Sequence, residues 1–433
     1  GEGDFNYVEI DTIRNPIEFD RVRPKVVKFD PFERERRLSM NNDLMNLKRE
    51  SLIDPHVKDV VNKCIDIAFM QNNQYDLGIR LAATFDLMVS AAYYKSVSNR
   101  GWTYCSDDPQ MMFYTYTNVC PRCRGNGRFV YAKANKPESG KIGQITTEIL
   151  CVFYQSIFTR KGHDVEVFKA SEPVDVIVHD INKDVFLLAE VKAAPLLTVP
   201  LAAKCEAITE MRDGILVKSE HESIDNPFLR NSSIELYFPA YNNKEERFYP
   251  LELNWENETC FYDAMLKLMK KGGFFSDYLD FWFTSYNAYI NKSREVSLYW
   301  LTNACGGPVP IPEDWPKRAG TGYESVSDSK TSAGMDRTDD IKKGIYQVLK
   351  IGAEYKTTKK NIRTAIISNL PALRHYDEYL LTIKDIVWTI SEEPFVSSWK
   401  DLPTDTPVYN LFDGIISLTK SDIRDPWIKE LLS

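Results

Sequence analysis

The stretch that most constrains the fold is "SEPVDVIVHDINKDVFLLAEVKAAPLLTVP", residues 171–200. Its two apolar runs, "VDVIV" and "VFLLAEVKAA", flank the turn sequence "INKD", and this pattern predicts an antiparallel hairpin. If the turn is centred on Asn182 and Lys183, and the outer residues of "INKD" pair with each other, the numbers of paired residues sum to 365. This register places Asp175 directly opposite Glu190.

The hairpin is expected to gather three charged side chains on one face of the sheet. Side chains alternate along a strand, so Glu190 and Lys192 share a face, and cross-strand partners such as Asp175 and Glu190 lie about 5 Å apart at Cβ. Two carboxylates at this distance repel each other unless a cation lies between them, and a divalent ion with oxygen ligands is the simplest choice. Since Lys192 could polarise a water molecule, these residues predict Mg²⁺-assisted hydrolysis of a phosphodiester.

A predicted helix, "GKIGQITTEILCVFYQSIFTRKG", and a predicted strand, "HDVEVFKA", precede the hairpin. A helix, a strand, a strand with Asp and a strand that ends in Glu-x-Lys, in this order, resemble the PD-(D/E)XK nuclease superfamily, which includes the type II restriction endonucleases. The resemblance covers about residues 141–238. It implies an α/β (α+β) core in which helices flank a mixed central sheet.

The resemblance also implies a role for each residue of the motif. Asp175 and Glu190 would bind the metal ion together with the backbone carbonyl of Val191, and Lys192 would position or activate the attacking water. Many members carry a further acidic residue on the preceding helix, and Glu148 fits that position. The chain departs from the family pattern in "PVD", where a valine separates the proline from Asp175.

The bare pattern of an acidic residue two positions before a lysine is not specific, because it also occurs in "DSK", "DIK" and "EYK". Those copies lie in predicted loop or helix, whereas Glu190 ends an apolar strand. The alternative is a hairpin whose charged rim faces solvent, where an ion pair between Glu190 and Lys192 contributes little. For Glu148 the alternative is an exposed glutamate on a helix.

A second candidate metal site is "YCSDDPQMMFYTYTNVCPRC", in which Cys120 and Cys123 form a Cys-x-x-Cys pair and Cys105 lies upstream. A structural zinc ion usually has four ligands. The fourth could come from Cys151, His163, Asp107 or Asp108. The alternative is three unrelated reduced thiols, as in other cytosolic proteins.

The composition is that of a soluble globular chain, since 43% of the 433 residues are hydrophobic and 27% are charged. No run approaches the roughly 18 apolar residues of a membrane span, and "GEGDFNYVEIDTIRN" lacks the features of a secretory signal. We therefore expect a cytoplasmic protein without a membrane partner. The net charge of −8 excludes a surface covered in positive charge, so a nucleic acid would need a local basic groove.

Two segments could supply such a groove. In the C-terminal third, the residues predicted to contact DNA are Lys342, Lys343, Lys356, Lys359, Lys360 and Arg363. The second segment is "CPRCRGNGR", with Arg122 and Arg124. Since the chain has 54 Lys and Arg, a solvated basic surface is the alternative for both.

The order of the patterns predicts three consecutive regions. Residues 1–100 form a helical N-terminal region, residues 101–255 hold the nuclease core with a Cys-rich insertion at 101–136, and residues 256–433 form a mainly helical, DNA-contacting region. Within these regions "LAAKCEAITEMRDG" is predicted to be helical and "SSIELYFPAY" a strand. The hydroxyl of Thr338 is predicted to cap the helix "DDIKKGIYQVLKIGAEY".

Together these features predict a Mg²⁺-dependent, sequence-specific endonuclease for double-stranded DNA that resembles a type II restriction enzyme. We expect a homodimer, since each active site cuts one strand, and a structural Zn²⁺ at the cysteines as a second metal. The family resemblance implies 5′-phosphate and 3′-hydroxyl ends. Two alternatives stay open: a structure-specific repair, recombination or transposition nuclease of the same superfamily, and a DNA-binding module that keeps the fold without cleaving.

Overall fold

The structure is a computed structural model. It describes residues 7–9, 44–71, 74–95, 102–105, 108, 111–114, 121–122, 139–204, 209–212, 215–218, 233–291, 334–357, 361–389 and 403–433. These residues form α-helices together with parallel and antiparallel strands, which confirms a mixed α and β fold. None of the helices in these ranges is long and apolar enough to cross a membrane.

The chain divides into two compact units. The first comprises Gly1–Ser51, Tyr154–Ala193 and Gly334–Ser433, and the second comprises Leu52–Phe153 and Ala194–Ala333. Each unit is therefore built from segments that are far apart in the sequence.

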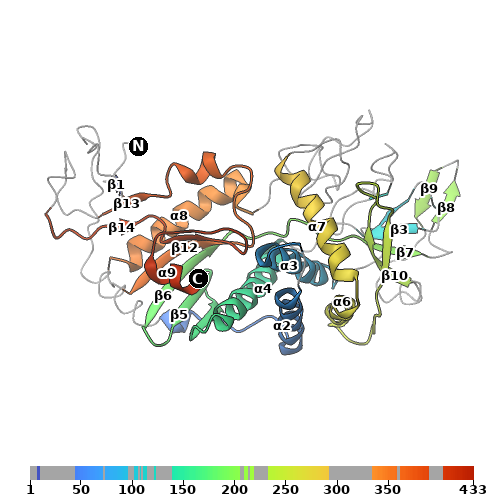
Figure 1. The fold of residues 1–433 in the computed structure, drawn as a ribbon, viewed down its shortest axis with the longest axis horizontal. Helices are drawn as coiled ribbons and strands as arrows, with labels where there is room; N and C mark the ends of the chain where they lie inside the picture. The colour runs from blue at the N-terminus through green and yellow to red at the C-terminus, as the bar shows by residue number, and fades with distance from the viewer. Residues whose placement is uncertain are drawn as a thin grey trace. The chain divides into compact units, whose positions relative to one another are not determined.

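The centre of the first unit is a six-stranded mixed sheet with the order β16-β15-β12-β6-β5-β4. Figure 1 labels three of its strands, β12, β6 and β5. Its strands are β4 (Val165–Lys169), β5 (Val176–Asp180), β6 (Val185–Val191), β12 (Ile362–Ile367), β15 (Gly414–Ile416) and β16 (Asp422–Ile423). β12 runs parallel to β6 and β15, and the other neighbours are antiparallel. β6 lies in the interior of the sheet, which agrees with its continuous apolar run.

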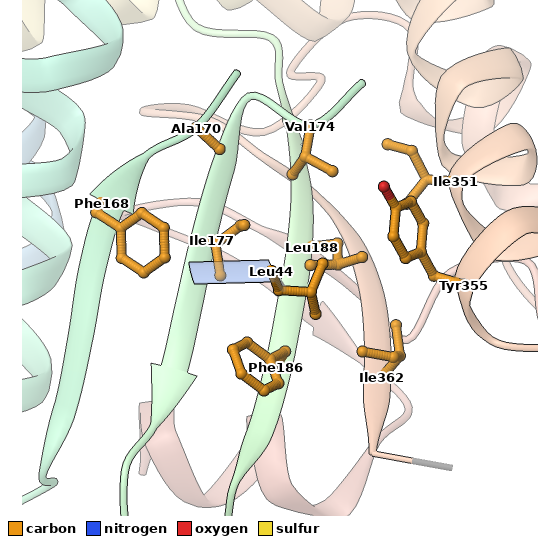
Figure 2. Packing of buried hydrophobic residues seen from close by; sticks show 10 residues of the cluster. All are labelled: Leu44, Phe168, Ala170, Val174, Ile177, Phe186, Leu188, Ile351, Tyr355 and Ile362. Carbon is orange, nitrogen blue, oxygen red and sulfur yellow. The ribbon is translucent and has the colours of Figure 1, made fainter. Parts of the chain in front are cut away.

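The helix α8 (Thr338–Tyr355) packs against β6 and β12. Its buried residues recur every three or four positions, as in a helix with one buried face: Ile341, Gly344, Val348, Ile351, Gly352 and Tyr355. Figure 2 shows Ile351 and Tyr355 in one core cluster with Leu188 of β6 and Ile177 of β5. A helix from the C-terminal part of the chain thus covers the apolar face of the hairpin.

The first unit also contains smaller elements around the sheet. These are 3-10 helices at Leu44–Leu47 and Gly334–Asp336, a π-helical turn at Asp377–Leu381, a second sheet of β1 (Tyr7–Glu9), β13 (Ile386–Trp388) and β14 (Tyr409–Asn410), and α9 (Pro426–Leu432). The indole Nε1 of Trp427 in α9 donates a hydrogen bond to Oδ2 of Asp180 at 3.0 Å. This bond ties α9 to the end of β5.

The second unit combines helices with an antiparallel sheet of the order β11-β10-β7-β3-β2 and a hairpin of β8 and β9. Its elements are α2 (Pro55–Met70), α3 (Leu77–Tyr94), β2 (Trp102–Tyr104), β3 (Met111–Tyr114), most of α4 (Ser139–Arg160), β7 (Leu201–Lys204), β8 (Thr209–Arg212), β9 (Ile215–Lys218), β10 (Ser233–Phe238), β11 (Arg247–Pro250), α6 (Cys260–Lys270) and α7 (Phe274–Ile290). The carboxylates of Asp54 and Asp76 cap α2 and α3. The predicted strand "SSIELYFPAY" is confirmed as β10.

The two units do not coincide with the predicted regions 1–100, 101–255 and 256–433. β12, which was assigned to the C-terminal region, pairs with β6 of the predicted core. Residues 334–433, which belong to the region predicted to be mainly helical, also carry the strands β12 to β16 beside α8 and α9. These strands have only two to six residues, too few for their periodicity to stand out in the sequence.

Two local predictions are also wrong. "LAAKCEAITEMRDG" contains strands β7 and β8, because the pairing of β7 with β3 and β10 outweighs the helix propensity of alanine, glutamate and methionine. The N-cap of α8 is Arg337 without a side-chain capping bond, and the hydroxyl of Thr338 instead makes a 2.6 Å hydrogen bond with the hydroxyl of Tyr379.

Candidate active site

The hairpin has the predicted register. Its pairs run from Val176 with Ala189 to Asp180 with Val185, and the next position outward places Asp175 opposite Glu190. One detail differs, because the outer residues of "INKD" do not join the ladder and the turn comprises all four residues, 181–184. The carboxylate of Asp180 accepts a hydrogen bond from the N–H of Lys183, a local bond that favours such turns.

The three predicted side chains lie together at the end of the hairpin opposite the turn. Oδ2 of Asp175 accepts a hydrogen bond from the N–H of Val191 at 2.9 Å, which fixes this carboxylate beside β6. Nζ of Lys192 donates to Oε1 of Glu190 at 2.8 Å. Glu190 is 5% exposed and the side chain of Lys192 is 17% exposed, so the reading of a solvent-facing rim is wrong.

Buried apolar side chains lie next to these charged groups. Ile177 and Leu188, one same-face pair further along the hairpin, are buried in the cluster of Figure 2. Val174, the residue that separates the proline from Asp175 in "PVD", belongs to the same cluster and is 1% exposed. The departure from the family pattern thus supplies a core residue that anchors the start of β5.

The surroundings of Glu190 oppose its ionisation. Burial, and after it the negative charge of Asp175, raise the pKa of Glu190 to about 7, although the hydrogen bond from Lys192 acts in the other direction. The single positive charge of Lys192 therefore does not outweigh the burial of Glu190 together with the charge of Asp175.

This raised pKa predicts how stability depends on pH. The folded protein holds the proton of Glu190 more tightly than the unfolded chain, so the contribution of this group is lost as the pH rises from about 4.5 through about 7. In metal-free buffer, Glu190→Gln is expected to remove this loss and to be more stable than the wild type at pH 8 by roughly 3 kcal/mol. Urea unfolding at pH 5 and pH 8 measures the effect, with Glu172→Gln, an exposed residue, as the control. Parallel pH profiles for wild type and Glu190→Gln would contradict it.

The chemistry of the site fits a divalent cation with oxygen ligands. Asp175 and Glu190 could hold it, with the carbonyl of Val191 as a third oxygen. Within the described residues, no group of three or more His, Cys, Asp or Glu side chains could hold a metal. Two carboxylates with few further protein ligands suit Mg²⁺, which usually keeps several waters and binds substrate phosphates.

Glu148 is buried in the second unit, contrary to the alternative of an exposed helix residue. Its carboxylate accepts hydrogen bonds from the N–H groups of Leu52 (2.7 Å) and Ile53 (2.8 Å), ahead of α2. These bonds give Glu148 a structural role. Its part in the active site stays a prediction.

The cysteine site is described only in part, because Cys120 and Cys123 lie outside the described residues. Cys105 is buried in a hydrophobic cluster that includes Met111 and Phe113. Two other potential zinc ligands lie in separate surroundings. Asp108 lies 3.5 Å from the guanidinium of Arg122, and Cys151 is buried in α4. The zinc ion stays a prediction.

The predicted DNA-contacting residues fall into three groups. Lys342 and Lys343 are exposed on α8. Lys359, Lys360 and Arg124 lie outside the described residues. The remaining three are held by carboxylates: Lys356 by Asp413 (2.5 Å), Arg363 by Asp425 (2.5 Å) and Arg122 by Glu246 (2.7 Å).

For Lys356 the predicted DNA contact is wrong, because the residue is only 6% exposed. Its Nζ also donates to the carbonyl of Asn410 at 3.0 Å. Arg363 and Arg122 keep 27% and 22% of their side chains exposed, but their guanidinium groups already bind protein carboxylates. Of the predicted DNA-contacting residues that the structure describes, Lys342 and Lys343 are thus the exposed ones.

Lys356→Met is expected to lower the free energy of unfolding by about 3–5 kcal/mol, because it leaves the charge of Asp413 buried without its partner. Lys350→Met, at an exposed position of the same helix, should change it by no more than about 0.5 kcal/mol. Denaturant unfolding of both variants provides the measurement. Equal, small effects would show that Lys356 is not a core residue.

Two residues that the sequence did not point to contact Lys192: Gly344 of α8 and Ser368, which follows β12. A glycine inside a predicted helix was the only signal for the first. No sequence signal pointed to Ser368, because its contact with Lys192 depends on which strand lies beside β6.

No protein-family model, curated protein or solved structure matches this chain. The functional assignment therefore rests on the geometry of the hairpin and its surroundings.

Proposed function

We propose that the protein is a metal-dependent phosphodiesterase whose active site is formed by Asp175, Glu190 and Lys192. The observation that carries the proposal is the pair of carboxylates held side by side at the end of β5 and β6, with a lysine amine 2.8 Å from one of them. More particularly, we propose a Mg²⁺-dependent, sequence-specific endonuclease for double-stranded DNA, of the type II restriction kind.

Each residue has a distinct task in this proposal. Asp175 and Glu190, with the carbonyl of Val191, would hold Mg²⁺, which supplies a Lewis acid for the scissile phosphate and lowers the pKa of a bound water. Nζ of Lys192 lies where it can orient the attacking water and offset the negative charge that develops on the phosphate. Because Glu190 has a pKa of about 7, metal binding should displace a proton below neutral pH.

One further feature supports DNA as the substrate. Lys342 and Lys343 are exposed on the same helix whose buried face touches Lys192 through Gly344. They would bind phosphates near the site without reading sequence. The homodimer is part of the proposal for a chemical reason, since one site cuts one strand and a duplex presents two.

A cleavage assay on plasmid DNA tests the proposal. The protein is incubated with a long unmethylated plasmid in Mg²⁺ and, separately, in EDTA. Discrete fragments that appear only with Mg²⁺ indicate a sequence-specific nuclease, and a smear indicates a nuclease without sequence preference. Binding without cleavage would contradict the proposed activity and favour a DNA-binding module.

A further inference from the structure

Gly344 lies directly against the side chain of Lys192. A Cβ atom added to Gly344 would lie 3.3 Å from both Cγ and Cε of Lys192, and 3.4 Å from Cδ1 of Ile366. These separations are shorter than the roughly 3.5–4.0 Å of carbon atoms in favourable contact. Since glycine inside a helix is less favourable than alanine, helix propensity does not account for it. It lets α8 approach β6 without moving Lys192.

Ser368 holds the main chain of Lys192 from the neighbouring strand. The parallel ladder of β6 and β12 ends at Val191 and Ile367. Beyond it, the N–H of Lys192 donates to the carbonyl of Ile367 at 3.1 Å, and Oγ of Ser368 donates to the carbonyl of Lys192 at 2.8 Å. Ser368 is itself fixed, because the hydroxyl of Tyr154 donates to its carbonyl at 2.7 Å. Both polar groups of the Lys192 backbone are therefore bound by the β12 segment.

We infer that Gly344 and Ser368 are positioning residues that together determine where Nζ of Lys192 lies relative to Glu190. Ser368 fixes the main chain just beyond β6, and the space at Gly344 accommodates the alkyl chain, so that Nζ reaches Oε1 of Glu190. The catalytic consequence rests on the proposed function. The position of Nζ is independent of it and can be measured without DNA.

Gly352 provides a matched control for Gly344, because both glycines lie on the buried face of α8. A Cβ atom at Gly352 would lie 3.1 Å from Cζ2 of Trp388 and 3.5 Å from Cδ of Lys356, so it would disturb packing away from the active site. Gly344→Ala and Gly352→Ala therefore make the same chemical change against different neighbours.

Crystal structures of the two metal-free variants give the first readout. In Gly344→Ala, the Lys192 side chain should move by a few tenths of an ångström or more, and Nζ should move away from Oε1 of Glu190. In Gly352→Ala the contact between these two atoms should stay at 2.8 Å. An unchanged contact in Gly344→Ala overturns the inference whatever the DNA assay shows. A displaced Nζ with no cleavage by the wild type would keep the positioning role and reject the proposed nuclease.

Steady-state cleavage gives the second readout. Gly344→Ala should lower kcat about tenfold with KM unchanged, since sub-ångström misplacement of a reacting group affects the chemical step and not binding. Gly352→Ala should keep the wild-type kcat. Equal kcat values for wild type and Gly344→Ala would refute the catalytic part of the inference.

Ser368→Ala tests the other half, with Ser417→Ala as its control. Ser417 is a buried serine just after β15 whose Oγ donates to the carbonyl of Lys420 and does not reach Lys192. Ser368→Ala should lower kcat severalfold with KM unchanged, and Ser417→Ala should not. Equal kcat values for the two variants, with both folded, would remove Ser368 from the positioning role.

Discussion

Asp175→Asn and Glu190→Gln should each reduce the rate of Mg²⁺-dependent DNA cleavage by a factor on the order of 10³ or more while the protein stays folded. Each substitution removes one of the two carboxylates that would hold the metal and keeps the size and shape of the side chain. Single-turnover cleavage of a labelled duplex measures the rate, and circular dichroism with thermal unfolding checks the fold. DNA binding without metal should be kept or become tighter, because a negative charge near the phosphate is lost.

The control for these variants should be an acidic residue whose side chain is exposed and is not needed for folding. Asp180, on the opposite face of the hairpin, is unsuitable because it is buried and accepts hydrogen bonds from Trp427 and Lys183. Asp184→Asn is better, since the side chain of Asp184 is 74% exposed in the turn and asparagine keeps an oxygen for its 3.0 Å contact with Nε2 of His179. Near-normal cleavage by Asp175→Asn would show that this carboxylate is not a metal ligand.

Lys192→Met should lower the cleavage rate by roughly 10²–10³, the magnitude seen when one preorganised charge-stabilising donor is removed from an active site. Methionine keeps the length of the alkyl chain beside Gly344 but removes the amine that would face the attacking water. Both carboxylates remain, so the Mg²⁺ concentration needed for half-maximal rate should change little. A rate titration against Mg²⁺ gives both quantities.

Lys183→Met is the matched control, because Lys183 lies in the same hairpin and only makes an exposed ion pair with Glu430. It should cleave like the wild type. If Lys192→Met cleaves normally, Lys192 serves only to offset the charge of Glu190. If its rate is restored by high Mg²⁺, the lysine acts on metal binding and not on the chemical step.

The geometry of Asp175 and Glu190 could be predicted because it is local. Alternation along each strand and the position of a short turn determine which residues face each other, and a turn of four residues instead of two leaves that register unchanged. The strands β4 to β6 are local in the same sense.

The rest of the site could not be predicted, because it depends on contacts between distant segments. Nothing in "IRTAII" indicates that β12 lies parallel to β6. The hydrogen bond from Ser368 to Lys192 and the close packing of Gly344 against Lys192 could therefore not be predicted. Lys356 looked like one of many surface lysines, since its partner Asp413 follows a different strand. Burial of a charge is decided by such partners and not by the charged residue itself.

The parallel pairing of β12 with β6 has a consequence for synthesis of the protein. The hairpin leaves the ribosome before Ala194–Ala333, and only afterwards do α8 and β12 follow. At usual translation rates this interval lasts roughly 10–30 s. During it, Lys192 has neither the strand that binds its backbone nor the helix that packs on its side chain. In the nuclease that we propose, the contacts that position Lys192 are therefore complete only after most of the chain has been made.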